Sequence, residues 1–217
     1  MKRALVSTLF LAALAFQAQS QGARPGDAKA GEKKAAMCIG CHGIKGYQAS
    51  LPEVHKVPMI SGQVADFIVA SLDAYKKGER KHPTMRAIAG SLTEQDMADL
   101  AAFYAGQIGG GGEVPAKLAA VPDDVKKLLD KGACLACHGE NLSKPIGGAP
   151  KIAGQHADYL YVALKAYKTE ANPQVGRGNA IMAGQVKQFK PAELKLMAQY
   201  IGSLPGELHT VPQAKFK

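Results

Sequence analysis

The sequence contains no apolar stretch long enough to cross a bilayer as a helix. Its longest apolar run, from Ala4 to Phe16, has 13 residues, whereas a transmembrane helix needs about 18 or more. Aromatic residues make up only 6% of the chain, and no dense basic cluster is interleaved with them. These absences argue against an integral membrane protein and against a nucleic-acid-binding protein, so we expect no nucleic-acid partner.

The N-terminal apolar run has the features of a secretory signal peptide. Lys2 and Arg3 precede it, and Ala18-Gln19-Ser20 forms a small-x-small cleavage site directly after it. We therefore expect residues 1–20 to be a signal peptide that is cleaved near Ser20 during export. The alternative is that this segment stays uncleaved and anchors the protein.

Lysine and arginine outnumber aspartate and glutamate by 27 to 18. The excess lies mostly in the second half, because residues 21–110 carry 11 basic and 9 acidic groups whereas residues 111–217 carry 14 and 9. A mild basic excess favours docking onto an acidic partner, or it simply keeps the surface hydrated. Composition leaves both readings open.

The four cysteines fall into two C-x-x-C-H motifs, Cys38–His42 and Cys134–His138, which start 96 residues apart. Four cysteines in an exported chain would ordinarily suggest two disulfides. A four-cysteine zinc site usually separates its pairs by about 15–20 residues, and a thioredoxin-like motif needs a βαβ context. Here 93 residues separate Cys41 from Cys134, and no βαβ pattern is present. The motifs therefore favour covalent haem attachment.

The C-x-x-C-H motif suits haem attachment for a geometric reason. On a helix its two cysteines and its histidine project from one face within a single turn. Each thiol can then form a thioether with a haem vinyl group, while the imidazole binds the iron. We therefore predict two covalently bound haem c groups, with His42 and His138 as axial iron ligands. The cysteines predicted to form the thioethers are Cys38, Cys41, Cys134 and Cys137.

The similarity between the two halves extends beyond the cysteines, which indicates a domain duplication. A P-x-I-x-G-Q motif occurs at Pro58–Gln63 and again at Pro150–Gln155, 92 residues later. The offset returns to 96 if Tyr104 is matched with Tyr200. We predict an N-terminal domain over residues 21–108, a Gly/Pro linker over residues 109–121 and a C-terminal domain over residues 122–217.

Each copy is predicted to contain three helices. The first runs from about Asp27 into the first cysteine motif, and its counterpart starts near Pro122. The second begins after Ser61 or Ala153, and the third begins at Thr93 or Pro191. Because no convincing alternating strand pattern is present, the predicted fold class is all-α, with two tandem domains related by duplication.

Two methionines are the best candidates for the remaining axial position of each iron. Met85 and Met182 lie 43 and 44 residues after His42 and His138. We expect both in the irregular connection before the third helix, where a loop can approach the haem. A thioether ligand favours ferrous iron and raises the reduction potential, which suits electron transfer.

Other methionines and histidines are weaker candidates. Met59 aligns with Lys151 and so cannot serve both halves, while Met97 and Met197 fall inside the predicted third helices. The rival histidines, each without a counterpart in the other half and each expected to be solvent-exposed, are His55, His82, His156 and His209. His82, three residues before Met85, and His55 remain possible competing ligands.

With these motifs the chain resembles the dihaem cytochrome c4 family, which has two class I cytochrome c domains in tandem. The resemblance implies a periplasmic electron carrier in a respiratory chain, serving a membrane-bound cytochrome oxidase as its terminal acceptor. It also implies redox-protein partners, peripheral membrane contact and two haems that face each other across a pseudo-two-fold interface. In such domains a proline carbonyl accepts a hydrogen bond from the haem histidine, a role that Pro150 and Pro58 would fill.

Two other functions fit the same motifs. The chain could be the haem subunit of an oxidoreductase complex such as a flavocytochrome-type dehydrogenase, in which case a second subunit would bind it tightly. A dihaem peroxidase would need one open iron and a distal acid–base residue. We find no matching pair of distal residues, so we predict an electron-transfer protein rather than an enzyme.

Overall fold

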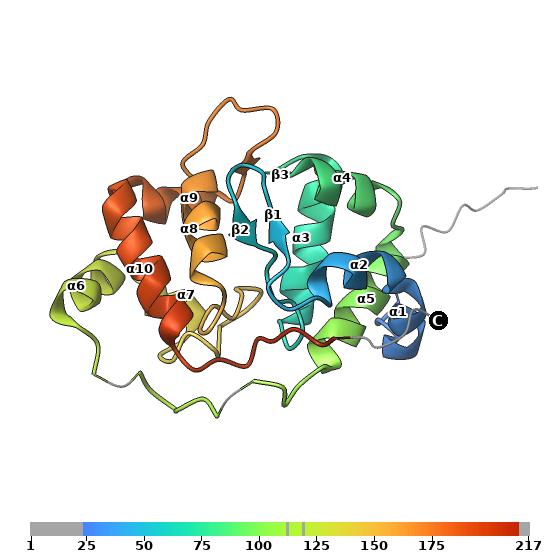
Figure 1. Cartoon of the computed structure of the whole chain (residues 1–217), viewed down its shortest axis with the longest axis horizontal. Coiled ribbons are helices and arrows are strands. Elements are labelled where there is room, and N and C mark those ends of the chain that lie inside the picture. Colours follow the sequence, from blue (N-terminus) through green and yellow to red (C-terminus); the bar gives the residue numbers. More distant parts are fainter. Residues whose placement is uncertain (1–23, 112, 119, 213–217) are drawn as a thin grey trace, which may run out of the picture.

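The computed structural model describes residues 24–212 except positions 112 and 119. The predicted signal peptide, residues 1–20, lies outside the described residues. Within the described part of the chain, no helix is both long enough and apolar enough to span a membrane. Figure 1 shows two helical halves side by side, with the first half in blue to green and the second in yellow to red.

The fold is all-α as predicted, with five helices in each half among the described residues and only two-residue strands. The helices of the first half are α1 (Ala28–Lys34), α2 (Ala36–His42), α3 (Ala65–Lys77), α4 (Pro83–Gly90) and α5 (Glu94–Gly106). Those of the second half are α6 (Asp123–Lys131), α7 (Cys134–His138), α8 (Ala157–Ala166), α9 (Ala180–Lys187) and α10 (Pro191–Ser203). The strands are β1 (Gln48–Ala49), β2 (His55–Lys56), β3 (Arg80–Lys81) and β4 (Gly176–Arg177).

Local signals set the helix ends where the sequence predicted them. The Asp27 carboxylate caps α1 by accepting from the amides of Lys29 and Ala30. Thr93 and Asp96 form a capping box at the start of α5, where the sequence predicted a helix to begin. At the other end of α3, Gly78 adopts a positive φ of 78° that most side chains disfavour, so the helix stops there.

The prediction of three helices per half was too simple. The first predicted helix is divided in two in each half, and Ala133, with φ of 47°, marks the break between α6 and α7. An additional short helix precedes the last one in each half. Met85 and Met182 are the third residues of these short helices, α4 and α9. The expectation that they lie in irregular connections was therefore wrong.

The alignment of the last helices was also wrong by one residue. The N-cap residues of α5 and α10 are Thr93 and Lys190, which lie 97 residues apart. The buried counterpart of Tyr104 is Ile201 rather than Tyr200, since both Tyr104 and Ile201 are 5% exposed. The matching of α5 with α10 follows from burial, because residues that face the core of one half correspond to residues that face the core of the other.

Each half has its own hydrophobic core. The first core is centred on Ile68, Met97 and Leu100, and the second on Leu129 and Leu194. Met97 of the first core and Met197 of the second are both buried, as their place in the last helices predicted. The division into two domains joined by residues 109–121 stays a prediction, and the described residues of that segment form no helix or strand.

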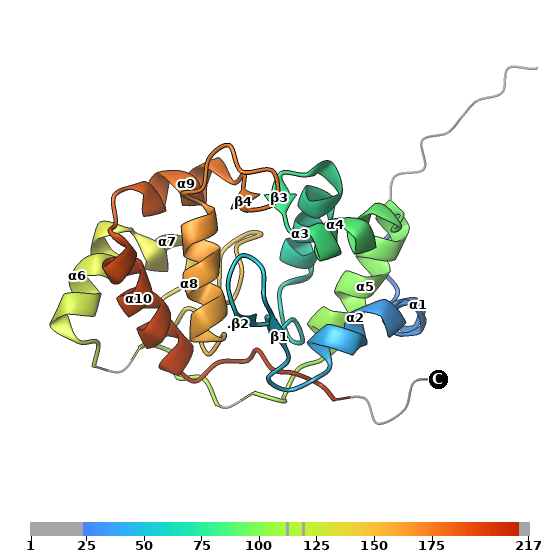
Figure 2. The ribbon, with the colours of Figure 1, turned by 45° about the horizontal axis from the view of Figure 1, so that its top comes forward.

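Two loops that break the symmetry of the repeat both cross between the halves. The first half has four additional residues between its histidine and its proline, and this loop forms the β1–β2 hairpin. The hairpin contacts α8, because the Lys56 amide donates to Asp158 at 3.1 Å and Lys165 pairs with Glu53 at 2.6 Å. Figure 2 shows the hairpin lying between α8 and α3.

The second loop is in the C-terminal half, where five additional residues separate Tyr167 from Met182. It ends in β4, which pairs antiparallel with β3 of the first half, so that Arg80 lies opposite Arg177. Figure 2 shows β3 and β4 side by side at the junction. The C-terminal segment also returns to the first half, where His209 donates its amide proton to the Ser61 carbonyl. The two loops whose lengths differ between the halves are thus interface elements.

Candidate functional site

One continuous cavity of about 840 Å³ runs through both halves and across their junction. This volume is near the upper end of the roughly 300–1,000 Å³ that ligand pockets occupy. All eight side chains singled out in the sequence line it: Cys38, Cys41, His42, Met85, Cys134, Cys137, His138 and Met182. Residues 144 positions apart in sequence are therefore brought onto the wall of one cavity.

The two motif histidines have matched surroundings. The Nδ1 atom of His42 lies 2.8 Å from the Pro58 carbonyl oxygen, and that of His138 lies 2.8 Å from the Pro150 carbonyl oxygen. A carbonyl can only accept, so Nδ1 carries the proton and Nε2 keeps its lone pair. Burial lowers the pKa of both imidazoles, which favours the neutral form. A neutral imidazole with a free Nε2 is the form that binds iron.

No disulfide joins the four cysteines to one another, as thioether attachment of haem requires. Cys38 and Cys41 lie on α2 with His42 at its end, and the second motif occupies α7 in the same way. Burial raises the pKa of the Cys38 thiol and raises that of Cys134 to about 11. The C-x-x-C-H spacing therefore places each pair of cysteines and its histidine on one short helix.

The residues that precede the two methionines act as helix caps. The Met182 amide donates to the Asn179 Oδ1 atom at 2.9 Å, and the Met85 amide donates to the His82 Nδ1 atom at 3.4 Å. His82 and Asn179 are therefore equivalent residues with the same local task. His82 also lines the large cavity, but its Nδ1 atom is already used as the cap acceptor.

The expectation that the other histidines are solvent-exposed was wrong. His55 is only 5% exposed, and the remaining three are partly buried. The His55 ring stacks on Tyr159 of the other half at 6.2 Å between centroids, and its Nδ1 atom lies 2.8 Å from the Glu53 carbonyl oxygen. The sequence could not predict this burial, because the hairpin carrying His55 is covered by the opposite half.

Two glutamines of the repeated motif join the halves reciprocally. The Gln63 side chain accepts from the Lys151 amide at 2.8 Å and donates to the Lys151 carbonyl at 3.0 Å. Gln155 makes the same pair of contacts with Met59, at 3.1 and 2.9 Å. Since Gln63 and Gln155, like Met59 and Lys151, are equivalent positions of the repeat, the junction has the pseudo-two-fold symmetry that the family resemblance implied.

The motif glycines are required by the same packing. Gly62 and Gly154 have φ of 81° and 73°, which L-residues rarely adopt. A Cβ at Gly62 would lie 2.9 Å from the Glu207 carbonyl oxygen, and one at Gly154 would lie 3.0 Å from the Leu204 carbonyl oxygen. Glycine thus lets each glutamine reach across the junction.

The sequence reasoning missed two arginines on the cavity wall, Arg80 and Arg177. The Nε atom of Arg80 is buried without a hydrogen-bond partner among the described residues. A buried cationic side chain with an unused donor suits a ligand with carboxylate groups, as haem has. The missed signal was spacing, because each arginine precedes its methionine, Met85 or Met182, by five residues.

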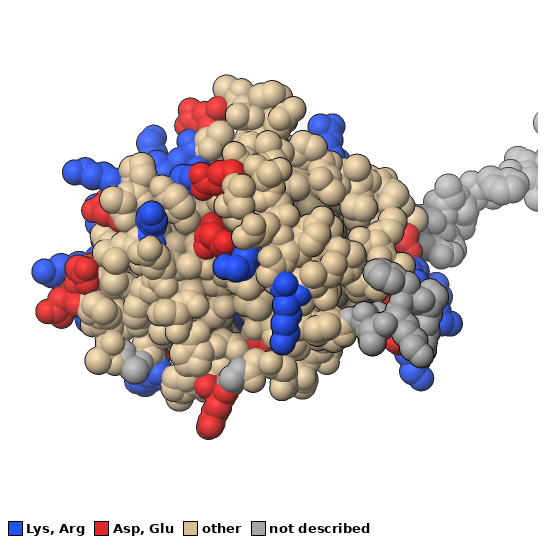
Figure 3. Space-filling model, viewed as in Figure 1, with Lys and Arg blue, Asp and Glu red and all other residues tan. Residues whose placement is uncertain are grey.

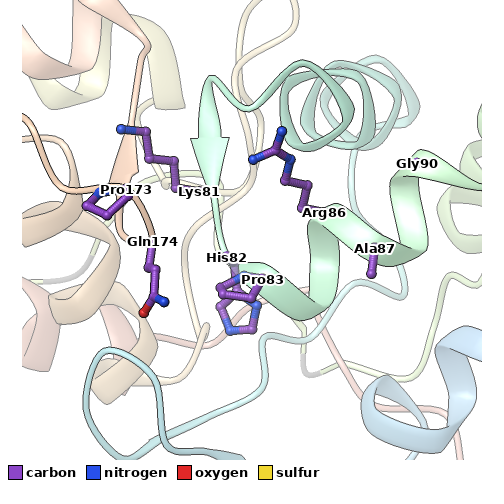
Figure 4. Close-up of a pocket in the computed structure, with 8 residues that line it drawn as sticks. All are labelled: Lys81, His82, Pro83, Arg86, Ala87, Gly90, Pro173 and Gln174. Atoms are coloured by element: carbon purple, nitrogen blue, oxygen red, sulfur yellow. The ribbon is translucent and has the colours of Figure 1, made fainter.

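A second, smaller hollow of about 510 Å³ lies between α4 and the loop that precedes β4. Figure 4 shows His82 and Arg86 on one side and Pro173 and Gln174 on the other, with the Lys81 side chain extending towards Pro173. The Lys81 Nζ atom donates to the Asn172 carbonyl across this hollow at 2.6 Å. The hollow is basic, but none of the predicted cysteines, ligand methionines or motif histidines lines it.

Comparison with known proteins places both halves in one family. The cytochrome c family model matches residues 28–105 and again residues 122–205. A cytochrome c4 from Thiocapsa roseopersicina is 31% identical, covering 86% of this chain and 97% of the relative. One from Stutzerimonas stutzeri is 29% identical and covers 94% of this chain and all of the relative.

The fold comparison agrees. The crystal structure of reduced recombinant cytochrome c4 from Pseudomonas stutzeri superposes with a TM-score of 0.63 at 27% identity, covering 82% of this chain and 99% of that one. A further relative, from Stutzerimonas stutzeri strain A1501, is named a thiosulfate dehydrogenase electron acceptor and is 26% identical over 88% of this chain and 90% of its own length. The chain therefore belongs to the dihaem cytochrome c4 family, carries two covalently bound haem c groups and is an electron-transfer protein rather than an enzyme.

Proposed function

We propose that this protein is a periplasmic electron carrier of a respiratory chain and that it donates electrons to a membrane-bound terminal oxidase. The bound haems supply a one-electron couple between ferrous and ferric iron. In this proposal Cys38 and Cys41 hold one haem and Cys134 and Cys137 hold the other. The axial pairs are His42 with Met85 and His138 with Met182, and removal of residues 1–20 accompanies export.

The observation that carries the proposal is the matched surroundings of the two axial pairs. Each histidine donates to a proline carbonyl over 2.8 Å, and each methionine lies third in a capped helix. Equal sites of this kind would close both irons with histidine and methionine. Six-coordinate iron suits outer-sphere electron transfer, whereas a peroxidase needs an open position.

The rim of the cavity supports transient contact with a redox partner. Tyr47 of the first half and Ile146 and Ile181 of the second line the cavity and are 42%, 71% and 69% exposed. Exposed apolar side chains beside a cofactor offer a contact area that needs little desolvation of charge. In the view of Figure 3, lysine, arginine and acidic side chains are scattered over the C-terminal half and the middle, and the upper face of the N-terminal half is largely uncharged.

A second candidate function is that of electron acceptor for a dehydrogenase. The relative from Stutzerimonas stutzeri strain A1501 has a name of that kind. In this case a dehydrogenase would reduce the protein directly, and the terminal oxidase would be reached later in the chain. Stopped-flow reduction by a purified dehydrogenase, compared with oxidation by purified oxidase-containing membranes, separates the two.

The first experiment is the optical spectrum of the mature protein, with haem counted as the pyridine haemochrome. We expect two haems per chain and, in the oxidised protein, the weak far-red band of a methionine–iron bond at full strength for both. Half of that band, or a high-spin component, would show that one methionine is not bound and would return the peroxidase to consideration. Oxidation of the reduced protein by oxidase-containing membranes then tests the acceptor.

A further inference from the structure

The junction between the halves contains a cluster of two arginines and one tyrosine. Arg80 on β3 and Arg177 on β4 lie opposite each other in the antiparallel pair. Both donate to the same hydroxyl group, that of Tyr159 on α8, at 2.8 and 2.9 Å. The donating nitrogens are thus less than about 6 Å apart, and all three residues line the large cavity.

Protein groups do not neutralise these two positive charges. Among the described residues neither arginine forms an ion pair. Arg80 donates to the Ser71 hydroxyl at 2.7 Å and lies 4.6 Å from the Tyr75 ring centroid. Arg177 lies 5.3 Å from the Tyr167 ring. Hydroxyl groups and ring faces orient a guanidinium without cancelling its charge.

Like charges held this close in a cavity repel each other, so the arrangement calls for an anion. The planar guanidinium fork binds carboxylates with two parallel hydrogen bonds. The Nε atom of Arg80, which has no hydrogen-bond partner in the described part of the chain, is one of the donors of that fork. The haem c groups shared with the family carry carboxylate side chains and belong in this same cavity.

The hydroxyl group that accepts from both arginines comes from one half alone, although the fold is duplicated. Phe67 occupies the position in α3 that Tyr159 occupies in α8, whereas Tyr75 and Tyr167 match. The Phe67 ring centroid lies 5.9 Å from Arg80. A residue of the C-terminal half therefore orients an arginine of each half.

We propose that Arg80, Arg177 and Tyr159 form a shared seat for the carboxylate groups of both haems, and that Tyr159 is the positioning residue of this seat. The Tyr159 hydroxyl accepts from one arginine of each half and so fixes both guanidinium groups. The potential of each haem then depends on a residue of the opposite half. The inference rests on the two haem groups and is independent of which protein donates or accepts the electrons.

The test is spectroelectrochemical titration of the full dihaem protein carrying Tyr159→Phe, which makes the cluster resemble its Phe67 counterpart. We expect both midpoint potentials to shift, because both arginines lose their common acceptor. Tyr161→Phe is the matched control. It removes a phenol from the same helix, outside the cavity lining, and should leave both potentials unchanged. Haem content and the far-ultraviolet circular dichroism spectrum check that each variant is folded.

A shift of only one potential, or of neither, in folded Tyr159→Phe protein would overturn the shared seat. If that variant does not fold, Arg80→Lys and Arg177→Lys take its place, since they keep the charge but remove the planar fork. Each should also shift both potentials, and a shift confined to one would again refute the proposal. A further check is the double variant Phe67→Tyr/Tyr159→Phe, which should restore part of the shift by returning one hydroxyl to the cluster.

Discussion

The two halves build the same site but hold it in different ways. In the first half α1 is tied to α5 by charge: the Asp99 carboxylate, 3% exposed, accepts from the Asp27 amide at 2.9 Å and from Lys34 at 2.6 Å. In the second half α6 contributes apolar side chains, Val125 and Leu129, to the core instead. A duplicated fold therefore keeps the side chains around its cofactor while the supporting contacts diverge.

The halves also differ in the loops that vary in length. The β1–β2 hairpin exists only in the first half, and the longer loop before β4 exists only in the second. Each reaches across to the other half, so the asymmetry is complementary. Variation that would be neutral in an isolated domain has been used here to build a junction.

The largest expected effect is the loss of one haem when the cysteines of one half are replaced. Replacing Cys38 and Cys41 together with serine removes both thioethers of the first half. We expect the haem count to fall from two per chain to one, because thioether formation is what holds the cofactor covalently. Mass spectrometry and the pyridine haemochrome measure this count. The double replacement of Cys134 and Cys137 is the matched variant, and two covalent haems in either variant would contradict the assignment.

Replacing one methionine with histidine should increase the difference between the midpoint potentials of the two haems. Met85→His and Met182→His should each lower one midpoint potential by on the order of a few tenths of a volt, because imidazole stabilises ferric iron more than a thioether does. Redox titration followed in the visible spectrum measures both potentials. The two variants should affect different potentials. If either leaves both potentials and the far-red band intact, that methionine is not an axial ligand.

The Asp99 contacts of the first half should contribute more to the free energy of unfolding than an exposed ion pair of the second half. Asp99→Asn should destabilise the protein by roughly 1.5 kcal/mol, since it removes the charge from a buried acceptor of the Asp27 amide and leaves Lys34 paired with Asp96 alone. Asp130→Asn, which breaks the exposed Lys126–Asp130 pair on α6, should cost less than about 0.5 kcal/mol. Denaturant unfolding of both variants measures the difference, and equal effects would refute this distinction.

The Asp99 contribution should also depend on pH in a definite direction. Hydrogen bonds from the Asp27 amide and from Lys34 lower the pKa of Asp99 to about 2. A lowered pKa stabilises the folded state above the ordinary value of 3.8, and this stability is lost as the pH falls towards 2. The difference in stability between the native protein and Asp99→Asn should therefore be constant near neutral pH and shrink between about pH 4 and pH 2.

The smallest expected difference concerns the two helix caps. Asn179→Ala should cost about 1 kcal/mol, and His82→Ala should cost roughly half of that, because the His82 contact is longer, at 3.4 Å against 2.9 Å. Thermal unfolding of the two haem-containing variants measures both effects. A larger loss for His82→Ala would mean that His82 does more than cap α4.

Much of the site followed from spacing alone. The residues of a C-x-x-C-H motif must share a helical face whatever the rest of the chain does, so Cys38, Cys41 and His42 were identified without a structure. The duplication then singled out Met85 and Met182 as candidate ligands by symmetry. The short helices that carry these methionines were missed, since an eight-residue helix has only about two turns, too few to show a clear periodic pattern.

By itself the sequence determined the all-α class, the repeated motifs and the cysteine, histidine and methionine candidates in each half, because these depend on local spacing and helical periodicity. Only the tertiary structure decided how the halves meet. The stacking of His55 on Tyr159, the reciprocal contacts of Gln63 and Gln155 and the hydrogen bond from Arg80 to Tyr159 join residues 79 to 104 positions apart. Such contacts depend on how the surfaces of the two halves pack against each other, and local sequence patterns do not predict this packing.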